Sequence, residues 1–551
     1  MSDFPSLPAD GTTPLPMLLA RALKARGVTH AFGMPGGDTL SLLDAFREVG
    51  IDFVAIRHEG TAAFMADAVY HVTRTPGVCV ATLGPGATNL VRGVAGSLLE
   101  RSRVVAITNQ IASHLRDRCT HQVIDHIELF KPITRRAVHV QGETAGMQVM
   151  MTLAAMERQA PGPVLLDIPE EMNAVAVPAV DPHWGRPRGP RPVPDVGAAA
   201  ARLAAARRPV IAVGCGELSN TAANGVRRLQ LAANAVGLTT CRGAGMLDED
   251  HPLWAGTFGL SPAVDAVQQA LLREADLLVA VGLDRVELRA DWRPGWPDEL
   301  PVILIDAHGQ PDLMGNITDR LHGPLMQTLD ALREAAFGES DVVVSGVSVL
   351  QDASLAAHRH AWRLPFLDGP DGPAAAIHAV QKASPEGTRF CLDVGAHRIA
   401  AAHVLRARMP NQILQSNGFS SMGVGLPAAI ACKLVEPGRP VVALTGDASL
   451  SMTLGELGTA QERRLDLVVV CLSDCAPELS PPAEQGRRNL PETGMTFMGP
   501  DVEKLVAAFG GTGVSVRGKR AVEQAVREAH ARGGLTVVSV SVDPTALRHR
   551  M

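Results

Sequence analysis

Short, continuous runs of Val, Ile and Leu recur along the whole chain, and each run is bounded by glycine, proline or aspartate. Such runs are typical of β-strands that are buried on both faces, as in parallel sheets covered by helices. Stretches with helical periodicity separate them; in the first, Leu15, Leu18 and Leu19 share one helical face. The sequence therefore predicts an α/β protein. The runs are VTHAFG, VCVATL, RVVAIT, PVLLDI, PVIAVG, DLLVAVG, PVILID, TRFCLDVG, PVVALTGD, DLVVVCLSD and LTVVSVSVD.

Two segments interrupt this alternation and mark domain boundaries. Residues 181–196 are dense in proline and have no periodicity, and the stretch around 363–373 is irregular and rich in glycine and proline. At about 150 residues per domain, a chain of 551 residues is long enough for three or four domains. We predict three domains, each a parallel sheet flanked by helices, over residues 12–180, 195–335 and 370–545.

The composition argues against several classes of protein. Apolar residues make up 46% of the chain and charged residues 20%, as in soluble globular proteins. The net charge of -6 comes with no Lys/Arg cluster, so we expect no nucleic-acid or membrane partner. The start of the chain lacks the basic and apolar segments of a secretion signal, and no apolar run reaches the roughly 18 residues of a membrane span. We therefore expect a cytoplasmic protein.

The eight cysteines are scattered and form no CxxC motif. Several lie within apolar runs such as GVCVAT and VVVCLS, so buried free thiols are a better interpretation than disulfides or zinc ligands. Aromatic residues make up only 3% of the chain, so stacking platforms for bases or sugars are scarce.

Ligands bind open parallel sheets at the carboxyl ends of the strands, and two of these ends carry an aspartate. Gly446-Asp447-Ala448-Ser449 follows the run PVVALT, and Asp474 follows the next run, LDLVVVCLS. Because one predicted helix separates the runs, both carboxylates can converge on one cation that prefers oxygen ligands, such as Mg²⁺ bound to a diphosphate. An aspartate at this position can also serve only as a helix N-cap, so the motif alone leaves both interpretations open.

Further motifs precede these aspartates and fill the first domain. SNGFSSMGVGLPAAIA lies before them, and the first domain holds GVTHAFGMPGG, RHEGTAAFMADAV, ATLGPGATNL and VVAITNQ in this order. Together these motifs resemble the thiamine diphosphate enzymes of the acetolactate synthase and pyruvate decarboxylase superfamily. The resemblance includes the middle domain, which reads GMLDEDHPLWAG, and covers nearly the whole chain. It implies pyrimidine-binding, central and diphosphate-binding domains, in chain order, with thiamine diphosphate and Mg²⁺ as cofactors.

The resemblance implies a catalytic role for Glu59, in the motif RHEG, as the carboxyl that hydrogen-bonds N1′ of the cofactor's aminopyrimidine. A partly buried carboxyl there can share a proton with the ring and so promote loss of the thiazolium C2 proton. A Glu before Gly is otherwise an ordinary solvated helix start, but the position of Glu59 after an apolar strand favours function. His121 and Gln122 are similar to the polar pair that faces the substrate, although an isolated histidine is often structural.

The resemblance also implies which residues bind the cofactor. Met422 matches the bulky residue that wedges between the two cofactor rings, and Ser420 would offer its backbone carbonyl to the 4′-amino group. His397 follows two residues that would meet the diphosphate, but its own side chain could be structural. The implied cofactor-binding set is Pro35, Gly36, Glu59, Asn89, Gly395, Ala396, His397, Ser420, Met422, Gly446, Asp447, Ala448, Ser449 and Asp474. The implied metal ligands are Asp447, Asp474 and Ala476.

Two details narrow the choice within the superfamily. The run Thr120-His121-Gln122, and aspartate rather than asparagine at position 474, are both similar to the catabolic, flavin-free acetolactate synthases. FAD-containing synthases usually have Phe at the position of His121, so we expect no flavin. The implied reaction decarboxylates pyruvate and joins the product to a second 2-oxo acid. Because the resemblance implies that two subunits share each cofactor, we expect a homodimer or a homotetramer.

Other interpretations stay open. The Thr-His-Gln run also occurs in carboxyethylarginine synthases, and 2-oxo acid decarboxylases use the same cofactor. Ala448 stands where the family has the last glycine of GDG, which a methyl group allows only at negative φ. Three prolines between residues 477 and 482 disfavour the helix that usually follows the metal ligand, so we expect an irregular loop over residues 475–495. These departures also fit a non-catalytic paralogue with a binding or regulatory role.

Overall fold

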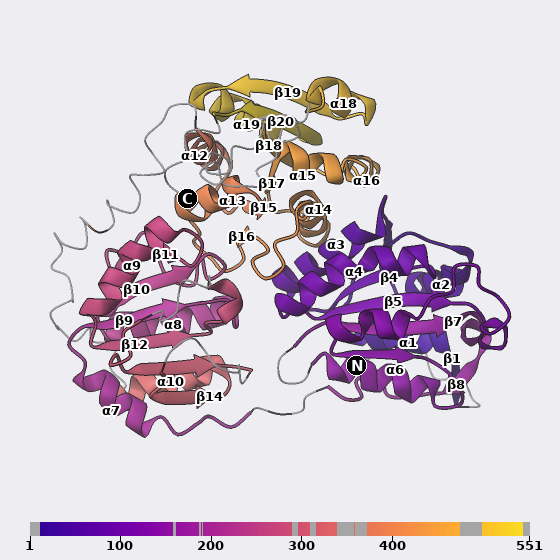
Figure 1. The fold of residues 1–551 in the computed structure, drawn as a ribbon, viewed down its shortest axis with the longest axis horizontal. Helices are drawn as coiled ribbons and strands as arrows, with labels where there is room; N and C mark the ends of the chain where they lie inside the picture. The colour runs from indigo at the N-terminus through magenta and orange to yellow at the C-terminus, as the bar shows by residue number, and fades with distance from the viewer. Residues whose placement is uncertain are drawn as a thin grey trace, which may run out of the picture.

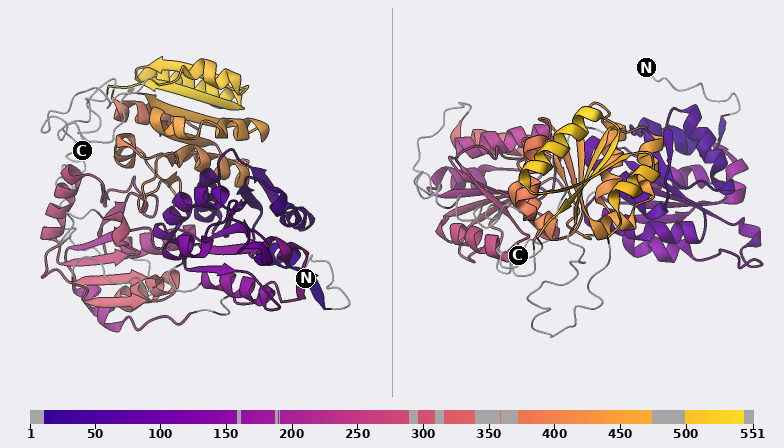
Figure 2. Two further views of the ribbon diagram at one scale, coloured as in Figure 1. Left: turned by 45° about the vertical axis from the view of Figure 1, so that its right-hand side comes forward. Right: turned by 90° about the horizontal axis from the view of Figure 1, so that it is seen from above.

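The computed structural model describes residues 11–157, 161–186, 189, 191–288, 296–308, 316–338, 358, 372–473 and 499–543. These residues form three six-stranded sheets, one after another along the chain and each flanked by helices (Figure 1). Every strand pair within the three sheets is parallel. The predicted α/β class is therefore confirmed. The C-terminal unit lies over the other two, which lie side by side (Figure 2).

The N-terminal sheet has the strand order β3-β2-β4-β5-β7-β6. Its strands are β2 (His30–Gly33), β3 (Asp52–Ala55), β4 (Gly77–Ala81), β5 (Val104–Gln110), β6 (Arg136–His139) and β7 (Val164–Pro169). The accompanying helices are α1 (Leu15–Ala25), α2 (Leu40–Glu48), α3 (Glu59–Thr73), α4 (Pro85–Leu99), α5 (His126–Phe130) and α6 (Ala145–Ala155). A short antiparallel pair, β1 (Thr12–Pro14) with β8 (Ala176–Pro178), lies outside this sheet.

The central sheet has the order β11-β10-β9-β12-β13-β14. Its strands are β9 (Pro209–Val213), β10 (Val236–Thr240), β11 (Trp254–Phe258), β12 (Leu277–Val281), β13 (Val302–Asp306) and β14 (Asp319–His322). Its helices are α7 (Gly197–Ala205), α8 (Asn220–Ala232), α9 (Pro262–Glu274) and α10 (Leu325–Phe337). All residues of β9 and β12 are buried, as the apolar runs predict for strands covered on both faces.

The C-terminal sheet has the order β16-β15-β17-β18-β20-β19. Its strands are β15 (Arg389–Leu392), β16 (Ile413–Leu414), β17 (Val441–Gly446), β18 (Leu467–Ser473), β19 (Thr512–Arg517) and β20 (Leu535–Ser541). Its helices are α12 (Pro373–Ala383), α13 (Ala396–Val404), α14 (Gly425–Val435), α15 (Asp447–Met452), α16 (Glu456–Glu462), α18 (Val502–Ala508) and α19 (Lys519–Arg532).

In each of the three sheets the strand order reverses at an interior position, which lies after the second strand in the N-terminal and C-terminal sheets and after the third strand in the central sheet. In each sheet the chain forms one strand, extends the sheet to one side and then returns to add a strand on the other side. The strands at the reversal are β2 and β4, β9 and β12, and β15 and β17. Crevices for ligands form at such reversals, outside the carboxyl ends of the two strands. The fold therefore offers one candidate crevice in each unit.

The N-terminal and C-terminal units share a hydrophobic core. Helix α3 packs against α4 on one side and against α14 of the C-terminal unit on the other, and Met65, Leu90 and Ile430 belong to one cluster of buried side chains. A Cβ at Gly93 of α4 would lie 2.4 Å from the Cβ of Ala63 in α3, so only glycine allows the two helices this approach. The crevice of one unit is thus held rigidly to the other unit's helices.

Two observations bear on the expectations from composition. Seven cysteines lie in the part of the chain that the structure describes, and all seven are free, five of them buried. Within the same ranges, no helix is both long enough and apolar enough to cross a membrane.

Candidate active site

The reversal in the C-terminal sheet places two aspartates side by side at the carboxyl ends of β15 and β17. Asp393, which follows β15, is completely buried and accepts hydrogen bonds from the backbone N–H groups of Gly423 at 2.8 Å and Gly425 at 2.9 Å. Burial raises the pKa of this carboxyl above its usual value, although the backbone donors act in the opposite direction. Asp393 thus ties the loop before α14 to the end of β15.

Asp447 begins α15 directly after β17, as the sequence predicts. It is buried, and its carboxylate accepts hydrogen bonds from the backbone N–H of Ala448 at 2.8 Å and from Ser473 Oγ, at the end of β18, at 3.2 Å. Ala448 is helical, so its methyl group does not require the left-handed backbone that glycine favours. Asp474, the next residue after Ser473, lies outside the described residues, as do Ala476 and the loop predicted over 475–495.

His397 is buried in the first turn of α13, beside these two strand ends. Its ring atoms would lie 3.6 and 3.7 Å from a Cβ at Gly446, so the ring faces the turn that leads into Asp447. Burial, and then the neighbouring charge of Arg398, lower the pKa of His397 to about 4, so the ring is neutral at physiological pH. Its Nε2 atom has no hydrogen-bond partner among the described residues. A buried, unpaired nitrogen is costly unless a ligand satisfies it.

The predicted diphosphate-binding residues therefore gather around one crevice. Gly395 and Ala396 precede His397 at the start of α13, and Ser449 is buried in α15, with its hydroxyl 3.5 Å from the carbonyl of Val394. The structure brings these residues together with Gly446, Asp447 and Ala448, although they come from segments about 50 residues apart.

The loop that carries Ser420 and Met422 lies beside this crevice. Ser420 has a φ of 50°, a left-handed conformation that costs a serine about 1–3 kcal/mol and persists only where the surroundings impose it. The Arg398 guanidinium contacts the loop, with Nη1 3.4 Å from Ser420 Oγ. Met422 is half-buried, and its neighbour Gly423 packs against Thr453, next to the end of α15.

In the N-terminal unit, Glu59 is the first residue of α3 and is buried. Its Oε2 accepts a hydrogen bond from Asn89 Nδ2 of α4 at 2.9 Å, and its Oε1 would lie 3.4 Å from a Cβ at Gly86. Glu59 and Asn89, which were each predicted to bind the cofactor, are thus in direct contact. The solvated helix start that the sequence left open does not fit, because only 6% of Glu59 is exposed.

The other predicted residues of the N-terminal unit lie on turns at the carboxyl ends of β2 and β4. Gly36, after exposed Pro35, donates its backbone N–H to Thr39 Oγ1 at 3.0 Å. Gln122 has a φ of 59° and lies on the turn at Gly84, where a Cβ would be 2.5 Å from the Gln122 carbonyl oxygen. His121 is exposed, and none of its described contacts joins it to Glu59.

A buried histidine that the sequence analysis did not single out supports the same turn. The backbone N–H of Gly84 donates to Nε2 of His126 at 3.2 Å, and Nδ1 of His126 lies 2.7 Å from Asp167 Oδ1. Asp167 also contacts His139 at 2.9 Å and Thr108 at 2.8 Å. Burial alone would raise the pKa of Asp167, but the hydrogen bonds from His126 and His139 lower it below its usual value.

Comparison with known proteins agrees with this geometry. Family models of thiamine pyrophosphate enzymes match all three units: the N-terminal TPP binding domain at residues 16–129, the central domain at 196–332 and the C-terminal TPP binding domain at 393–540. Acetolactate synthase isozyme 2 large subunit of Escherichia coli (strain K12) is 30% identical over 95% of each chain. The chain belongs to the acetolactate synthase family of thiamine diphosphate enzymes.

Other members of the acetolactate synthase family are similar to a comparable degree. Acetolactate synthase of Bacillus subtilis (strain 168) is 28% identical over 96% of this chain and 92% of its own. The catabolic acetolactate synthase of Raoultella terrigena is also 28% identical, over 96% of this chain and 94% of its own. The chain is thus a thiamine diphosphate-dependent enzyme of the lyase or transferase type, and these identities favour no branch of the family.

The cofactor of this family fits the residues of the C-terminal crevice. The unpaired Nε2 of His397 is buried beside Gly446 and is suited to donate to a diphosphate oxygen. Asp447 supplies carboxylate oxygens at the same edge, as a divalent cation requires. Within the described residues, no three His, Cys, Asp or Glu side chains form a ready metal cluster, so a metal here would need Asp474 or the cofactor's own oxygens.

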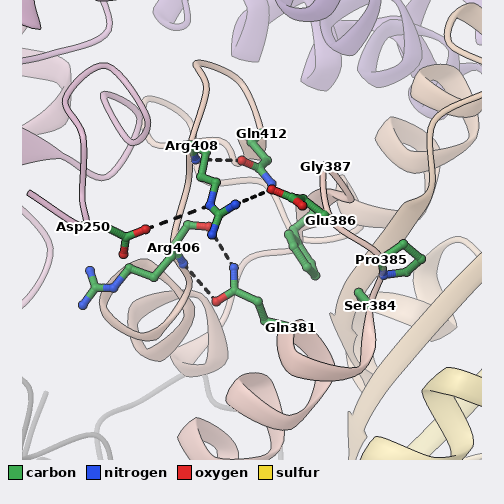
Figure 3. A pocket seen from close by; sticks show the side chains of 10 residues that line it. Asp250, Gln381, Ser384, Pro385, Glu386, Gly387, Arg406, Arg408 and Gln412 are labelled. Atoms are coloured by element: carbon green, nitrogen blue, oxygen red, sulfur yellow. Dashed lines mark hydrogen bonds and ion pairs between the residues drawn. The ribbon is translucent and has the colours of Figure 1, made fainter.

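A cavity of about 380 Å³ lies away from this crevice, at the amino end of β15. Figure 3 shows the side chains that line it. Its polar groups satisfy one another: Arg408 pairs with Glu386 and lies 4.0 Å from Asp250, and Gln381 exchanges two hydrogen bonds with the backbone of Arg406. No predicted site residue lines it. We interpret it as a seam between the central and C-terminal units.

The crevice of the central unit is also filled by the chain itself. Glu287 accepts a hydrogen bond from the backbone N–H of Cys215 at 2.9 Å, and its Oε2 would lie 2.5 Å from a Cβ at Gly214. Asp284 pairs with Arg101 of the N-terminal unit at 3.1 Å. Burial raises the pKa of Glu287 to about 7. The Gly214-Cys215-Gly216 segment is therefore a turn packed on an acidic side chain.

Proposed function

We propose that the enzyme uses thiamine diphosphate and Mg²⁺ to decarboxylate pyruvate and to join the resulting two-carbon unit to a second 2-oxo acid, as an acetolactate synthase does. One observation carries the proposal: each of two units holds a buried carboxylate after a strand end. Glu59 contacts Asn89 in the N-terminal unit, and Asp447 lies beside His397 in the C-terminal unit. When bound, thiamine diphosphate supplies a thiazolium ring that accepts the electron pair released by decarboxylation.

The residues of the C-terminal crevice hold the cofactor in this proposal. Asp447, with Asp474 and Ala476, would bind Mg²⁺, and His397 Nε2 would donate to the diphosphate. The Ser420 carbonyl and the Met422 side chain meet the aminopyrimidine. Asp393 supports this arrangement because it fixes the backbone of Gly423 and Gly425.

Glu59 holds the proton that the aminopyrimidine exchanges. Asn89 donates to Oε2 and so fixes the carboxyl plane, while Oε1 is left facing the turn at Gly86. Burial limits the contact of this carboxyl with water, so a bound aminopyrimidine would be its partner for proton exchange. His121 and Gln122, exposed above the turn at Gly84, contact the 2-oxo acid substrate in this proposal.

We propose a homodimer, or a homotetramer built from two such dimers, as the active form. Among the described residues, no hydrogen bond or ion pair joins Glu59 or Asn89 to Asp393, Asp447 or Ser449. Two large apolar side chains beside the crevice, Phe419 and Met452, are 45% and 56% exposed. A second copy that brought its Glu59 to this crevice would complete the site and cover both side chains.

We propose, more specifically, that the enzyme belongs to the catabolic, flavin-free branch of the family. The internal contacts of Glu287 and Asp284 support it, because they engage the polar groups at the reversal of the central sheet. The location in the cytoplasm stays a prediction.

The test is to purify the protein, add thiamine diphosphate and Mg²⁺, and screen 2-oxo acids alone and in pairs by mass spectrometry. We expect acetolactate from pyruvate alone, and no product without either cofactor. Aldehyde as the main product would indicate a decarboxylase, and a product that incorporates an amino acid would indicate the carboxyethylarginine synthase reaction. Tight cofactor binding with no product from any pair would indicate a non-catalytic paralogue.

A further inference from the structure

The loop of residues 416–423, which carries Ser420 and Met422, lies along helix α4 of the same chain. A Cβ at Gly418 would be 2.6 Å from the Cβ of Leu99, and a Cβ at Gly96 would be 3.8 Å from the Cβ of Phe419. Further along, a Cβ at Gly423 would be 3.9 Å from the Arg92 guanidinium. The loop therefore runs antiparallel to α4 and has no room to shift toward it.

Glu100, the residue directly after α4, forms hydrogen bonds with the start of this loop. Its Oε1 accepts hydrogen bonds from the backbone N–H groups of Asn417 and Gly418, both at 2.7 Å, and from Ser416 Oγ at 3.0 Å. Its Oε2 forms an ion pair with Arg242 of the central unit. Glu100 is 5% exposed, so its charge is buried at the junction of all three units and is compensated there by Arg242.

The opposite side of the loop contacts a cation. Arg398 Nη1 donates to the carbonyl oxygen of Ser416 and lies 3.3 Å from Asn417 Oδ1. The backbone N–H groups of Asn417 and Gly418 thus donate to the Glu100 carboxylate, and the carbonyl oxygen of Ser416 accepts from the Arg398 guanidinium. Hydrogen bonds to charged groups are stronger than neutral ones, so this arrangement fixes the position of the loop backbone.

We propose that Glu100 is a positioning residue for the cofactor: with Arg242 as its counter-ion, it holds loop 416–423 so that Ser420 and Met422 meet the aminopyrimidine. The inference rests on the proposed function in assigning that contact to Ser420 and Met422. The hydrogen bonds between Glu100 and the loop do not depend on that assignment. Because Asn89 near the other end of α4 contacts Glu59, one helix supports both the loop of its own chain's crevice and the Glu59 that, in the proposed dimer, serves the crevice of the second copy.

The first test needs no cofactor. Amide hydrogen exchange of the peptide covering residues 414–422, followed by mass spectrometry, reports on the N–H groups of Asn417 and Gly418. We expect Glu100→Ala to speed their exchange at least tenfold. The control is Glu436→Gln, which breaks the Arg389–Glu436 pair of the same unit, with contacts at 2.6 and 2.9 Å, and should leave this peptide unchanged. Equal protection of these amides in wild type and Glu100→Ala would show that Glu100 does not hold the loop.

The second test uses the enzyme saturated with thiamine diphosphate and Mg²⁺. We expect Glu100→Ala to slow exchange of the thiazolium C2 proton at least tenfold while cofactor affinity changes less, because the diphosphate is held by other residues. A merely destabilising change, such as Glu436→Gln, should leave the C2 exchange rate unaltered. A wild-type protein that binds no cofactor would contradict the proposed function. The amide-exchange test would still show whether Glu100 holds the loop.

A double variant keeps the inference testable if Glu100→Ala fails to fold. Glu100→Gln removes the carboxylate that pairs directly with Arg242, and Arg242→Gln leaves Glu100 buried without its counter-ion, so each should loosen the loop. Glu100→Gln/Arg242→Gln removes both charges and keeps an oxygen that accepts from the two N–H groups. We expect the double variant to protect these amides better than either single variant. Additive loss in the double variant would contradict the role of Arg242 as counter-ion.

Discussion

The C-terminal and central sheets are both parallel and both reverse their strand order, but the chemistry at the two reversals is opposite. At the end of β17, Asp447 lies beside a buried histidine whose Nε2 has no partner among the described residues. At the end of β12, Asp284 is paired with Arg101, and Glu287 accepts the backbone N–H of Cys215. One crevice is therefore ready for an anionic ligand, and the other is closed by the chain's own side chains.

This difference shows that topology gives only the place of a site. Ligands bind where the strand order reverses, but both sheets have such a place. A polar group that is buried and unpaired is costly in an empty site and is satisfied when a ligand arrives. The two crevices differ because His397 keeps a ring nitrogen without a partner among the described residues, whereas Asp284 and Glu287 are both engaged within the chain.

The largest effect should come from removing an aspartate at one reversal and not at the other. Asp447→Ala should weaken thiamine diphosphate binding by much more than tenfold, or several kcal/mol, because it removes a proposed Mg²⁺ ligand. Asp284→Ala, the matched change in the central sheet, should leave cofactor affinity unaltered. Isothermal calorimetry with Mg²⁺ present measures both. If Asp447→Ala binds the cofactor as tightly as wild type, the metal site is wrongly assigned.

At the closed crevice, Glu287 should make the stability of the folded protein depend on pH. Burial raises the pKa of Glu287 from its usual 4.5 to about 7, so the ionised carboxylate is disfavoured in the folded protein. The stabilisation present below pH 4.5 is therefore lost as pH rises through about 7. Relative to Glu287→Gln, the wild type should lose up to about 3 kcal/mol between pH 5 and pH 8. Thermal unfolding of both proteins at the two pH values checks this, and parallel pH curves would contradict it.

A smaller effect is expected at the unpaired nitrogen of the open crevice. His397→Phe keeps a ring but removes the donor, so cofactor affinity should fall roughly tenfold, the worth of one hydrogen bond to a charged group. His397→Gln keeps an N–H donor and should retain more of the affinity. If both variants bind like wild type, the diphosphate does not use this nitrogen and His397 is structural.

The smallest signal should come from the central crevice itself. Because Glu287 and Asp284 are engaged within the protein, we expect the purified enzyme to carry no flavin. An absorption spectrum of concentrated protein, with the denatured supernatant as a second sample, measures this. A stoichiometric yellow chromophore would show that the central crevice opens and would remove the distinction between the two sheets.

The sequence predicted most of what lies along single strands and their ends. Continuous apolar runs identify the parallel sheets, and Asp447 follows such a run directly. Asp393 was missed although it ends the run TRFCLDVG, where the same rule of strand ends would have found it. Its partners Gly423 and Gly425 lie 30 and 32 positions further along, so no local pattern indicates the contact.

Contacts between units were beyond the reach of the sequence for the same reason. Glu100 and the loop it grips are 316 to 318 positions apart, and a Glu in LLERSRVV has the composition of an ordinary helix end. Likewise, Glu287 meets Cys215 across 72 positions. Such pairs depend on how whole units pack, which periodicity and spacing do not encode.

Exchange of the thiazolium C2 proton for deuterium tests the central claim most directly, because it isolates the step assigned to Glu59 from substrate choice. Glu59→Gln keeps the size of the side chain and the contact with Asn89 but cannot pass a proton to the aminopyrimidine. At saturating thiamine diphosphate and Mg²⁺, we predict that exchange in the wild type is at least about a hundredfold faster than in Glu59→Gln, while cofactor affinity differs much less. Equal exchange rates in the two proteins would contradict the account.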